Sequence, residues 1–118
     1  AAIAAQETGG PGSNSGRNIV GDGGHGRGLF QIDDRWHSDF VNSGKAMDPL
    51  SNAMYAAGLF KQFLDRFNGD VHAALSAYNS GGNHCGTQTT WPDGSTLCYA
   101  DSVLKHQLSI QDLGSKCK

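Results

Sequence analysis

Glu7 is the only glutamate in the chain, and its position favours a role as a proton donor. It follows Ala4-Ala5-Gln6 toward the end of an expected helix, where the negative pole of the helix dipole and apolar neighbours favour the neutral carboxylic acid. Cleavage of an acetal needs such an acid together with a carboxylate that stays ionised. The alternative is an ordinary exposed glutamate, which the local sequence alone favours.

Two aspartates, Asp22 and Asp33, lie at the two ends of a glycine-rich and then apolar stretch. Antiparallel strands would bring these ends together, so both carboxylates could face one cleft and could hold and deprotonate a water molecule. Each has a structural alternative. Asp22 could be a turn residue that binds its own backbone, and Asp33 or Asp34 could form a surface ion pair with Arg35.

A tyrosine and an amide stand before two glycines in Ala77-Tyr78-Asn79-Ser80-Gly81-Gly82. At a helix end, Tyr78 and Asn79 could hydrogen-bond a sugar or its leaving group. The alternative is a core tyrosine followed by an asparagine that caps the helix, and the motif taken alone favours this alternative.

No metal, phosphate or cofactor site is expected. The glycine run of residues 21–28 resembles a phosphate-binding loop only superficially, because no Lys-Ser/Thr pair and no helix follow it. The side chains that could bind a metal also lack the spacing of a known site, so hydrogen-bonded or solvated histidines are predicted. These side chains are His25, His37, His72, His84, His106 and Cys85.

The chain has three cysteines, an odd number. Cys85 and Cys98 bracket a polar loop that contains Trp91-Pro92-Asp93-Gly94, and a disulfide there would restrain a segment poor in apolar residues. Such a bond would indicate a secreted, extracellular protein. The alternative is that all three cysteines are reduced, since spacing alone does not show a bond. If Cys85 and Cys98 are bonded, Cys117 is expected to be free or paired with a residue outside this sequence.

Length and composition narrow the function. A chain of 118 residues and 12.4 kDa predicts a single domain over residues 1–118 and a monomer. The net charge of -2 argues against nucleic acid, and no apolar stretch approaches the ~20 residues that a membrane span needs. Residues 1–7 read as the second half of a helix, which predicts that upstream helices are truncated or processed.

Apolar periodicity predicts three further helices. The first begins at Asp48-Pro49 and carries a wide apolar stripe to Asn68-Gly69, as expected for the central buried helix. The second begins at the cap Asp70 and ends before Gly81-Gly82. The third runs from about Ser95 or Thr96 to Leu113, and Gly114 stops it.

The remaining segments are short or irregular. Residues 28–33 are apolar with a polar Gln31 among them, which predicts a strand or small hairpin, and residues 35–47 predict a loop with a possible helical turn. Glycine is concentrated between residues 9 and 28, which excludes a continuous helix and favours tight turns. The predicted fold class is α+β, mainly α, with a small glycine-rich β-hairpin lobe.

The ordered set of motifs resembles the goose-type lysozymes and their relatives, the soluble lytic transglycosylases, which are glycoside hydrolases with a lysozyme-like fold. Each motif alone is modest, but their order is specific, and together they cover most of the chain. They lie at residues 2–8, 28–32, 76–81 and 99–103.

By this resemblance Glu7 is the catalytic acid, and Asp22 and Asp33 hold the attacking water. The chain departs from the family at Thr8, where many relatives have serine, and at Phe30, where methionine is more usual. Neither change removes a catalytic group. The resemblance also implies substrate-binding positions at His37, Tyr78, Asn79, Tyr99 and Gln31.

The implied reaction is inverting hydrolysis of β-1,4 bonds in an N-acetylated amino-sugar polysaccharide. Peptidoglycan is the expected substrate, while the slightly negative chain leaves neutral chitin as an alternative. A lytic transglycosylase, in which the substrate's own hydroxyl attacks, is a further alternative, and the presence of both aspartates argues against it. An inactive glycan-binding module on the same scaffold would be expected to lack the acid, and Glu7 is intact.

Overall fold

The computed structural model describes residues 1–116. It is mainly helical with two small antiparallel sheets, which confirms the predicted α+β, mainly α class. The helical segments are α1 (Ala2–Ala4), the π-helical turn η1 (Ala5–Gly9), the 3₁₀ turn η2 (Asp22–Gly24), α2 (Ser38–Asn42), α3 (Pro49–Arg66), α4 (Val71–Ser80) and α5 (Tyr99–Lys116). The strands are β1 (Val20–Gly21), β2 (Gly26–Arg27), β3 (Ile32–Asp33), β4 (Thr89–Thr90) and β5 (Thr96–Leu97).

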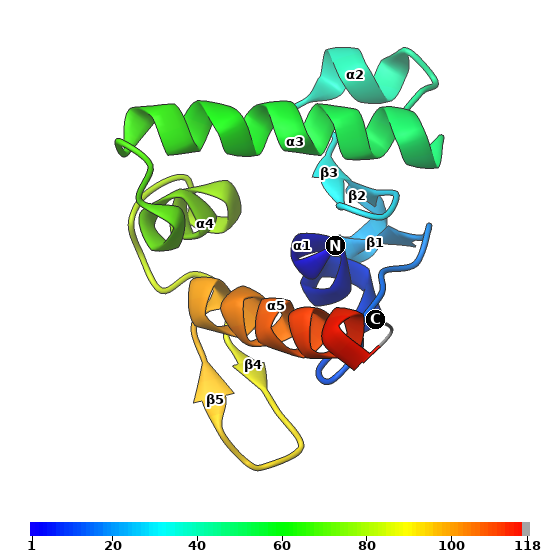
Figure 1. The fold of residues 1–118 in the computed structure, drawn as a ribbon. Helices are drawn as coiled ribbons and strands as arrows, with labels where there is room; N and C mark the ends of the chain where they lie inside the picture. Colours follow the sequence, from blue (N-terminus) through cyan, green and yellow to red (C-terminus); the bar gives the residue numbers. More distant parts are fainter. Residues whose placement is uncertain (117–118) are drawn as a thin grey trace.

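The two longest helices, α3 and α5, lie on opposite sides of the molecule, and α4 joins them at one end (Figure 1). The short helix α1 and the sheet β1–β3 lie between α3 and α5, and α2 lies on the outer side of α3. The helix α5 packs against both α4 and α1. The first residues of the chain are therefore enclosed by segments that follow much later.

The helix α3 forms where the sequence predicts it. The Asp48 side chain caps it by accepting from Ser51 N, and Pro49 occupies the first turn. Its description as the central buried helix is wrong, because it lies at the edge of the fold and buries only Asn52 and Ala56. On its outer side α3 is covered only in part by α2, whose Phe40 ring stacks on Tyr55 of α3, and Leu50 remains 70 % exposed.

The helix α4 also agrees with the sequence, since Asp70 caps it by accepting from Ala73 N and Gly81 ends it in the left-handed conformation, with φ 83°. The predicted limits of the last helix are wrong. Residues 96–97 form β5, so α5 begins only at Tyr99, and Gly114 lies inside the helix instead of ending it. The helical turn within residues 35–47 is present as α2.

The glycine-rich lobe is a three-stranded antiparallel sheet of order β1-β2-β3. The predicted strand over residues 28–33 is limited to Ile32–Asp33. Residues 28–31 form a turn in which Gly28 (φ 77°) and Gln31 (φ 50°) adopt left-handed conformations. Gly26 pairs with Gly21 on one side and with Asp33 on the other, so Asp22, which follows Gly21, and Asp33 lie at the same end of the sheet.

Asn52 of α3 holds this sheet in place. Its side chain is fully buried; Nδ2 donates to the carbonyl oxygens of Arg27 and Ala46 at 2.8 and 2.9 Å, and Oδ1 accepts from Phe30 N at 2.9 Å. A Cβ on Gly28 would lie 2.6 Å from Asn52 Nδ2, so only glycine allows this approach. The buried amide of Asn52 thus fixes the glycine-rich lobe to α3.

The hairpin β4–β5 extends from α5 and is closed by the predicted disulfide between Cys85 and Cys98, whose Cα atoms are 4.8 Å apart. Cys117 lies outside the described residues. Trp91 of the hairpin is buried and donates from Nε1 to the Ser102 hydroxyl at 2.9 Å. The hairpin is therefore packed onto α5 as well as covalently closed.

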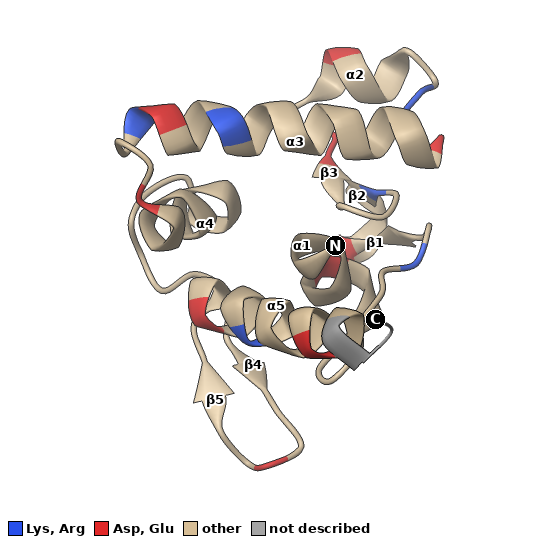
Figure 2. Ribbon diagram, in the orientation of Figure 1, with Lys and Arg blue, Asp and Glu red and all other residues tan. Residues whose placement is uncertain are grey.

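The core between α1, α4 and α5 is built largely from small side chains around Leu75, Tyr99 and Val103. No helix within residues 1–116 is both long and apolar enough to cross a membrane. Basic and acidic residues alternate along α3 and α5, and neither helix carries a run of one sign (Figure 2).

Candidate active site

A cleft of about 790 Å³ opens between the sheet, α3 and the end of α4. Its wall combines Glu7 from η1 with Asp22 and Asp33 from the sheet end and with Tyr78 and Asn79 from α4. The structure therefore brings together the residues that the sequence singled out as a candidate acid, two candidate water-holding groups and two candidate sugar-binding groups.

Glu7 is half-buried in η1, just after α1 ends. Tyr99 Oη donates to its Oε2 at 2.9 Å. Burial raises the pKa of Glu7 to about 7; the Tyr99 hydrogen bond opposes this shift, and the negative charge of Asp22 adds to it. The carboxyl group is therefore protonated over the acidic range and about half protonated near pH 7, so it can act as a general acid there.

The backbone that carries Glu7 is fixed by the next residue, Thr8, which is 3 % exposed. Its hydroxyl lies 3.1 Å from the carbonyl oxygens of both Ala4 and Leu29, which share its proton, and it accepts from Arg17 N at 2.6 Å. Only a hydroxyl both donates and accepts at this point. Serine keeps that hydroxyl, so the departure at Thr8 preserves the function of the side chain.

The preceding residue, Gln6, fixes the other side of the same turn. Its Nε2 donates to Thr89 Oγ1 at 2.7 Å, and its Oε1 accepts from the Ser102 hydroxyl. The turn that presents Glu7 is thus attached to both β4 and α5 as well as to the sheet.

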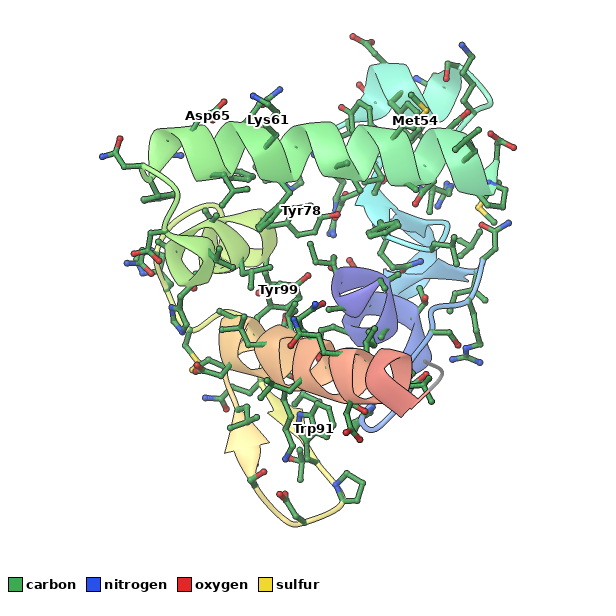
Figure 3. The ribbon with its side chains drawn as sticks, viewed as in Figure 1. Met54, Lys61, Asp65, Tyr78, Trp91 and Tyr99 are labelled. Carbon is green, nitrogen blue, oxygen red and sulfur yellow. A yellow bond between two sulfur atoms is a disulfide. The ribbon has the colours of Figure 1, made fainter. Side chains whose placement is uncertain are left out.

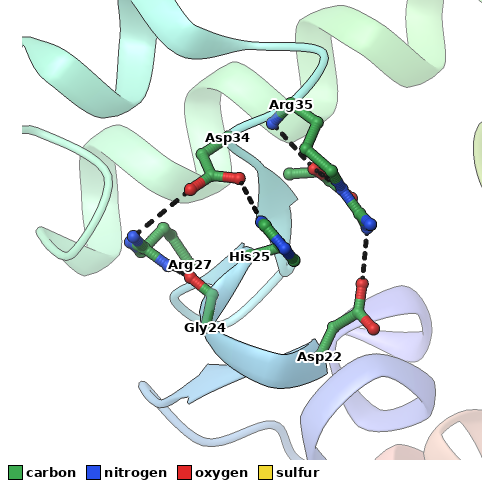
Figure 4. A network of polar contacts seen from close by, with 7 residues as sticks. Asp22, Gly24, His25, Arg27, Asp34 and Arg35 are labelled. Carbon is green, nitrogen blue, oxygen red and sulfur yellow. Dashed lines mark hydrogen bonds and ion pairs between the residues drawn. The ribbon is translucent and has the colours of Figure 1, made fainter.

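On the sheet side of the cleft, one guanidinium group binds both candidate water-holding aspartates. Arg35 Nη2 lies 2.8 Å from Asp22 Oδ2 and 2.6 Å from Asp33 Oδ2, and Arg35 Nε donates to Asp33 Oδ1 at 2.9 Å (Figure 4). The hydrogen bond from Arg35 lowers the pKa of Asp33 to about 2. Between about pH 2 and pH 7, Asp33 is therefore ionised while Glu7 is protonated.

Both structural alternatives for these aspartates are partly correct. Asp33 does form the ion pair with Arg35, and Asp22 does occupy a turn, with φ 51°. The Asp22 carboxylate nevertheless binds Arg35 and lines the cleft, and its negative charge raises the pKa of Glu7.

A second ion-pair network lies beside the first. Asp34 Oδ1 is 2.8 Å from His25 Nδ1, and Asp34 Oδ2 is 3.5 Å from Arg27 Nη2 (Figure 4). Within residues 1–116, His25, Asp33 and Asp34 form the one group whose ligand atoms lie within 4.8 Å of one another, the separation needed to hold a metal. Arg27 and Arg35 already bind these carboxylates, and two guanidinium groups disfavour a cation there.

Tyr78 and Asn79 reach the cleft from the end of α4, and Figure 3 shows Tyr78 extending into the space between α3 and α1. Tyr78 Oη donates to Phe30 O at 3.4 Å, and burial, with a contribution from the charge of Glu7, raises the pKa of Tyr78 so that it stays a donor. Asn79 accepts from Thr87 N at 2.8 Å and donates to Thr87 Oγ1 at 3.2 Å. The amide is thereby held in one orientation.

Two residues expected against the substrate have other surroundings. Tyr99 is 1 % exposed and lies behind Glu7, so its hydroxyl contacts the acid and not the open cleft. Gln31 lines the cleft, yet its amide nitrogen donates to the carbonyls of Ile19 and Gly28 at 3.0 and 2.9 Å. Tyr99 therefore acts on the site through Glu7, and Gln31 acts on it through the backbone of the sheet and its turn.

His37 lines the cleft where the sequence predicts it. Its Nδ1 lies 2.8 Å from Tyr55 Oη, and the Tyr55 ring stacks on Phe40 at 4.1 Å between centroids. Burial lowers the pKa of His37, and the Asp33 charge partly opposes this shift. The imidazole is therefore held neutral near pH 7 as a hydrogen-bonding group.

A family model described as the transglycosylase SLT domain matches residues 1–92. The chain belongs to this family. The matched stretch carries Glu7, both aspartates and Tyr78-Asn79, whereas Tyr99 and α5 follow it. No curated protein and no solved structure matches the chain.

The family match confirms the lysozyme-like fold of the SLT domain and identifies it as an enzyme that acts on peptidoglycan. The predicted resemblance is thus confirmed at the level of the lysozyme-like families. Glycan cleavage in this setting requires an acid at the scissile oxygen, and the cleft offers Glu7 for that position.

The sequence does not single out several residues that line the cleft of the SLT domain. Arg35 figured only as an ion-pair partner, although a cation two residues after Asp33 is a signal for a shared salt bridge. Trp36 lies in a predicted loop, where no helix or strand periodicity indicates which way its side chain points. Leu59 and Phe63 belong to α3, whose apolar stripe gave no indication of a cleft, and Thr87 depends on the disulfide-closed loop.

Proposed function

We propose that this SLT domain hydrolyses β-1,4 glycosidic bonds of peptidoglycan with inversion, as the goose-type lysozymes do. One observation supports this most directly: a half-buried acid with a pKa near 7, Glu7, shares a cleft with Asp22 and with Asp33, whose pKa Arg35 lowers to about 2. Environments that separate the pKa values of two carboxyl groups are typical of an acid and its ionised partner in glycosidases.

In the proposed reaction Glu7 gives its proton to the glycosidic oxygen as the bond to the anomeric carbon breaks. Positive charge develops on the sugar ring, and the group of Asp22, Asp33 and Arg35 has a net charge of about -1 that stabilises it. Water held by Asp33 attacks the anomeric carbon, and the water proton passes to Asp33.

Arg35 limits how strong a base Asp33 can be. A carboxylate with a pKa of about 2 removes a proton poorly from neutral water. Attack on a ring that already carries positive charge needs less assistance, because the water becomes acidic as its bond to carbon forms. The proposal therefore assigns Asp33 mainly to holding the water and taking its proton late.

A lytic transglycosylase is the second candidate, and two observations favour it. The matched family is described by that activity, and Arg35 occupies both aspartates that would otherwise activate water. In that reaction a hydroxyl of the substrate attacks the anomeric carbon, so no water needs to be held and an anhydro-sugar end results.

Chitin is the alternative substrate, because no element of the described chain carries a run of basic residues to attract the anionic wall. We also propose that the protein is secreted and acts as a monomeric single domain. The Cys85–Cys98 disulfide supports an oxidising compartment.

Product analysis tests the proposal. Purified peptidoglycan and chitohexaose are incubated with the enzyme, and NMR reads the anomer of the new reducing end and any anhydro sugar. We expect an inverted reducing end from peptidoglycan; an anhydro end overturns the hydrolase, and faster cleavage of chitohexaose overturns the peptidoglycan preference.

Three substitutions separate the roles. Glu7→Gln should reduce cleavage by ~10²-fold or more under either chemistry, and full activity in this variant would show that Glu7 is not the acid. Asp33→Asn and Asp22→Asn should reduce hydrolysis strongly but spare transglycosylation. Asp65→Asn, an exposed aspartate of α3 outside the cleft, is the matched control.

A further inference from the structure

Trp36 is unusually placed for a large aromatic side chain. It is 81 % exposed and also lines the cleft. The other large hydrophobic residues exposed in the described chain, such as Leu50 and Leu108, do not line the cleft. Covering the exposed indole face would remove apolar surface from water, so a ligand bound in the cleft would gain free energy by contacting it.

The turn that carries Trp36 is rigid although the indole itself is free. Trp36 N and His37 N both donate to Asp33 O, at 3.3 and 2.9 Å. The flanking side chains are fixed as well, since Arg35 binds two aspartates and His37 binds Tyr55. Within residues 1–116 the indole ring has no hydrogen bond, ring partner or cation contact.

The other tryptophan shows the contrast. Trp91 is 6 % exposed, donates from Nε1 to Ser102, and lies under α5 away from the cleft. Its environment satisfies both the ring and the nitrogen. Trp36 has the same indole ring and nitrogen, but within residues 1–116 neither has a partner.

We infer that Trp36 is a sugar-stacking platform that forms a substrate subsite at the Asp33 side of the cleft. The C–H face of an N-acetylated pyranose ring would cover the indole face, while hydroxyl and amide groups at the ring edge reach the polar wall of the cleft. An aromatic side chain suits this use, because only two side-chain torsions need to be fixed on binding and the backbone turn that carries them is already held by hydrogen bonds. The inference rests on the proposed function for its substrate class, but it adds a binding position that the catalytic groups do not require.

Tryptophan fluorescence tests the subsite directly, because Trp36 is exposed and Trp91 is buried. The Glu7→Gln variant, which should bind without cleaving, is titrated with chitohexaose and separately with soluble peptidoglycan glycan chains, and calorimetry measures the same binding. We expect the emission to shift to the blue on saturation. The shift should vanish in Glu7→Gln/Trp36→Phe while binding persists.

Affinity and kinetics give a second readout. In Trp36→Ala we expect Kd for the bound glycan and KM to rise about tenfold with little change in kcat, and Trp36→Phe should lie between this variant and wild type. Leu108→Ala, at another exposed apolar residue that lies on α5 outside the cleft, is the control and should change neither constant.

The outcomes separate this inference from the proposed function. Anhydro products together with a Trp36-dependent shift would overturn hydrolysis and leave the subsite intact. Inverted hydrolysis products together with wild-type affinity in Trp36→Ala would overturn the subsite alone. Saturable binding without any emission shift, or binding of neither glycan, also overturns the subsite.

Discussion

Glu7 and Asp33 face the same cleft, yet their surroundings hold them in opposite protonation states. Burial raises the pKa of Glu7 to about 7, while Arg35 lowers that of Asp33 to about 2. The residues that act on Glu7, Tyr99 and Asp22, are distant in the sequence, whereas Arg35 is only two residues from Asp33. At the scale of the residue, chemistry therefore depends less on which carboxyl groups are present than on what covers or pairs with each one.

Tyr99 lowers the pH at which Glu7 loses its proton, and with it the upper limit of the active pH range. Its hydroxyl donates to Glu7 Oε2 and stabilises the ionised form, so Tyr99→Phe should raise the pKa of Glu7 by roughly half a unit to one unit. Glu7 acts while protonated. The alkaline fall of kcat/KM, expected near pH 7 in the wild type, should therefore move to higher pH in the variant.

A pH profile of kcat/KM for wild type, Tyr99→Phe and Tyr78→Phe measures this limit. Tyr78 donates to Phe30 O and not to Glu7, so Tyr78→Phe should keep the wild-type alkaline limb even if its rate falls. An alkaline limb that moves to lower pH in Tyr99→Phe would contradict the assignment of Glu7 as the acid.

At the scale of the element, helices were predicted more accurately than strands. The caps Asp48 and Asp70 and the left-handed Gly81 are local signals, and they fix the start or end of α3 and α4. The sequence predicts a strand over residues 28–33, but residues 28–31 form a turn that a hydrogen bond from Phe30 N to Asn52 of α3 holds in place. Local pattern does not record such a contact.

The candidate site divides in the same way. The order of the motifs predicts that Glu7, Asp22 and Asp33 share one site, and the structure places all three in the cleft. The burial of Tyr99 and the double salt bridge of Arg35 depend on the packing of distant segments. Those tertiary contacts, and not the residue types, decide which residues meet the substrate and which act behind it.

Asn52 offers a test of how α3 holds the lobe. Asn52→Leu keeps a similar volume but leaves Phe30 N and the carbonyls of Arg27 and Ala46 without their buried partner, which should cost about 3 kcal/mol of unfolding free energy. Urea denaturation measures the loss. Because the lobe carries Asp22 and Asp33, kcat should fall as well.

Gln62→Leu on the same helix is the matched control for Asn52→Leu. Gln62 is exposed, so its substitution should change the unfolding free energy by less than about 0.5 kcal/mol. Equal stabilities for the two variants would show that the buried amide does not fix the sheet to α3.

At the scale of the whole molecule, the cleft joins segments that are far apart in the chain. Glu7 comes from its beginning, the aspartates from the sheet, Phe63 from α3 and Thr87 from the loop after α4. Hydrogen bonds from Gln6 to Thr89 and between Asn79 and Thr87 tie the disulfide-closed loop to both the acid and the end of α4. The bond between Cys85 and Cys98 therefore bears on the site as well as on the hairpin.

Removing this disulfide should weaken both the fold and the cleft. The bond closes a loop between residues separated by 13 positions, for which loop entropy predicts about 3 kcal/mol of stabilisation, or roughly a 10 °C fall in Tm for a domain of this size. Thermal unfolding of Cys85→Ser/Cys98→Ser, compared with Cys117→Ser as a cysteine control that keeps the bond, measures the effect. KM should also rise in the double variant, because Asn79 and Thr87 lose their fixed orientation. If the double variant keeps the Tm and KM of the control, the loop holds its place by packing of Trp91 and the Gln6 contact alone, and the disulfide contributes nothing to the site.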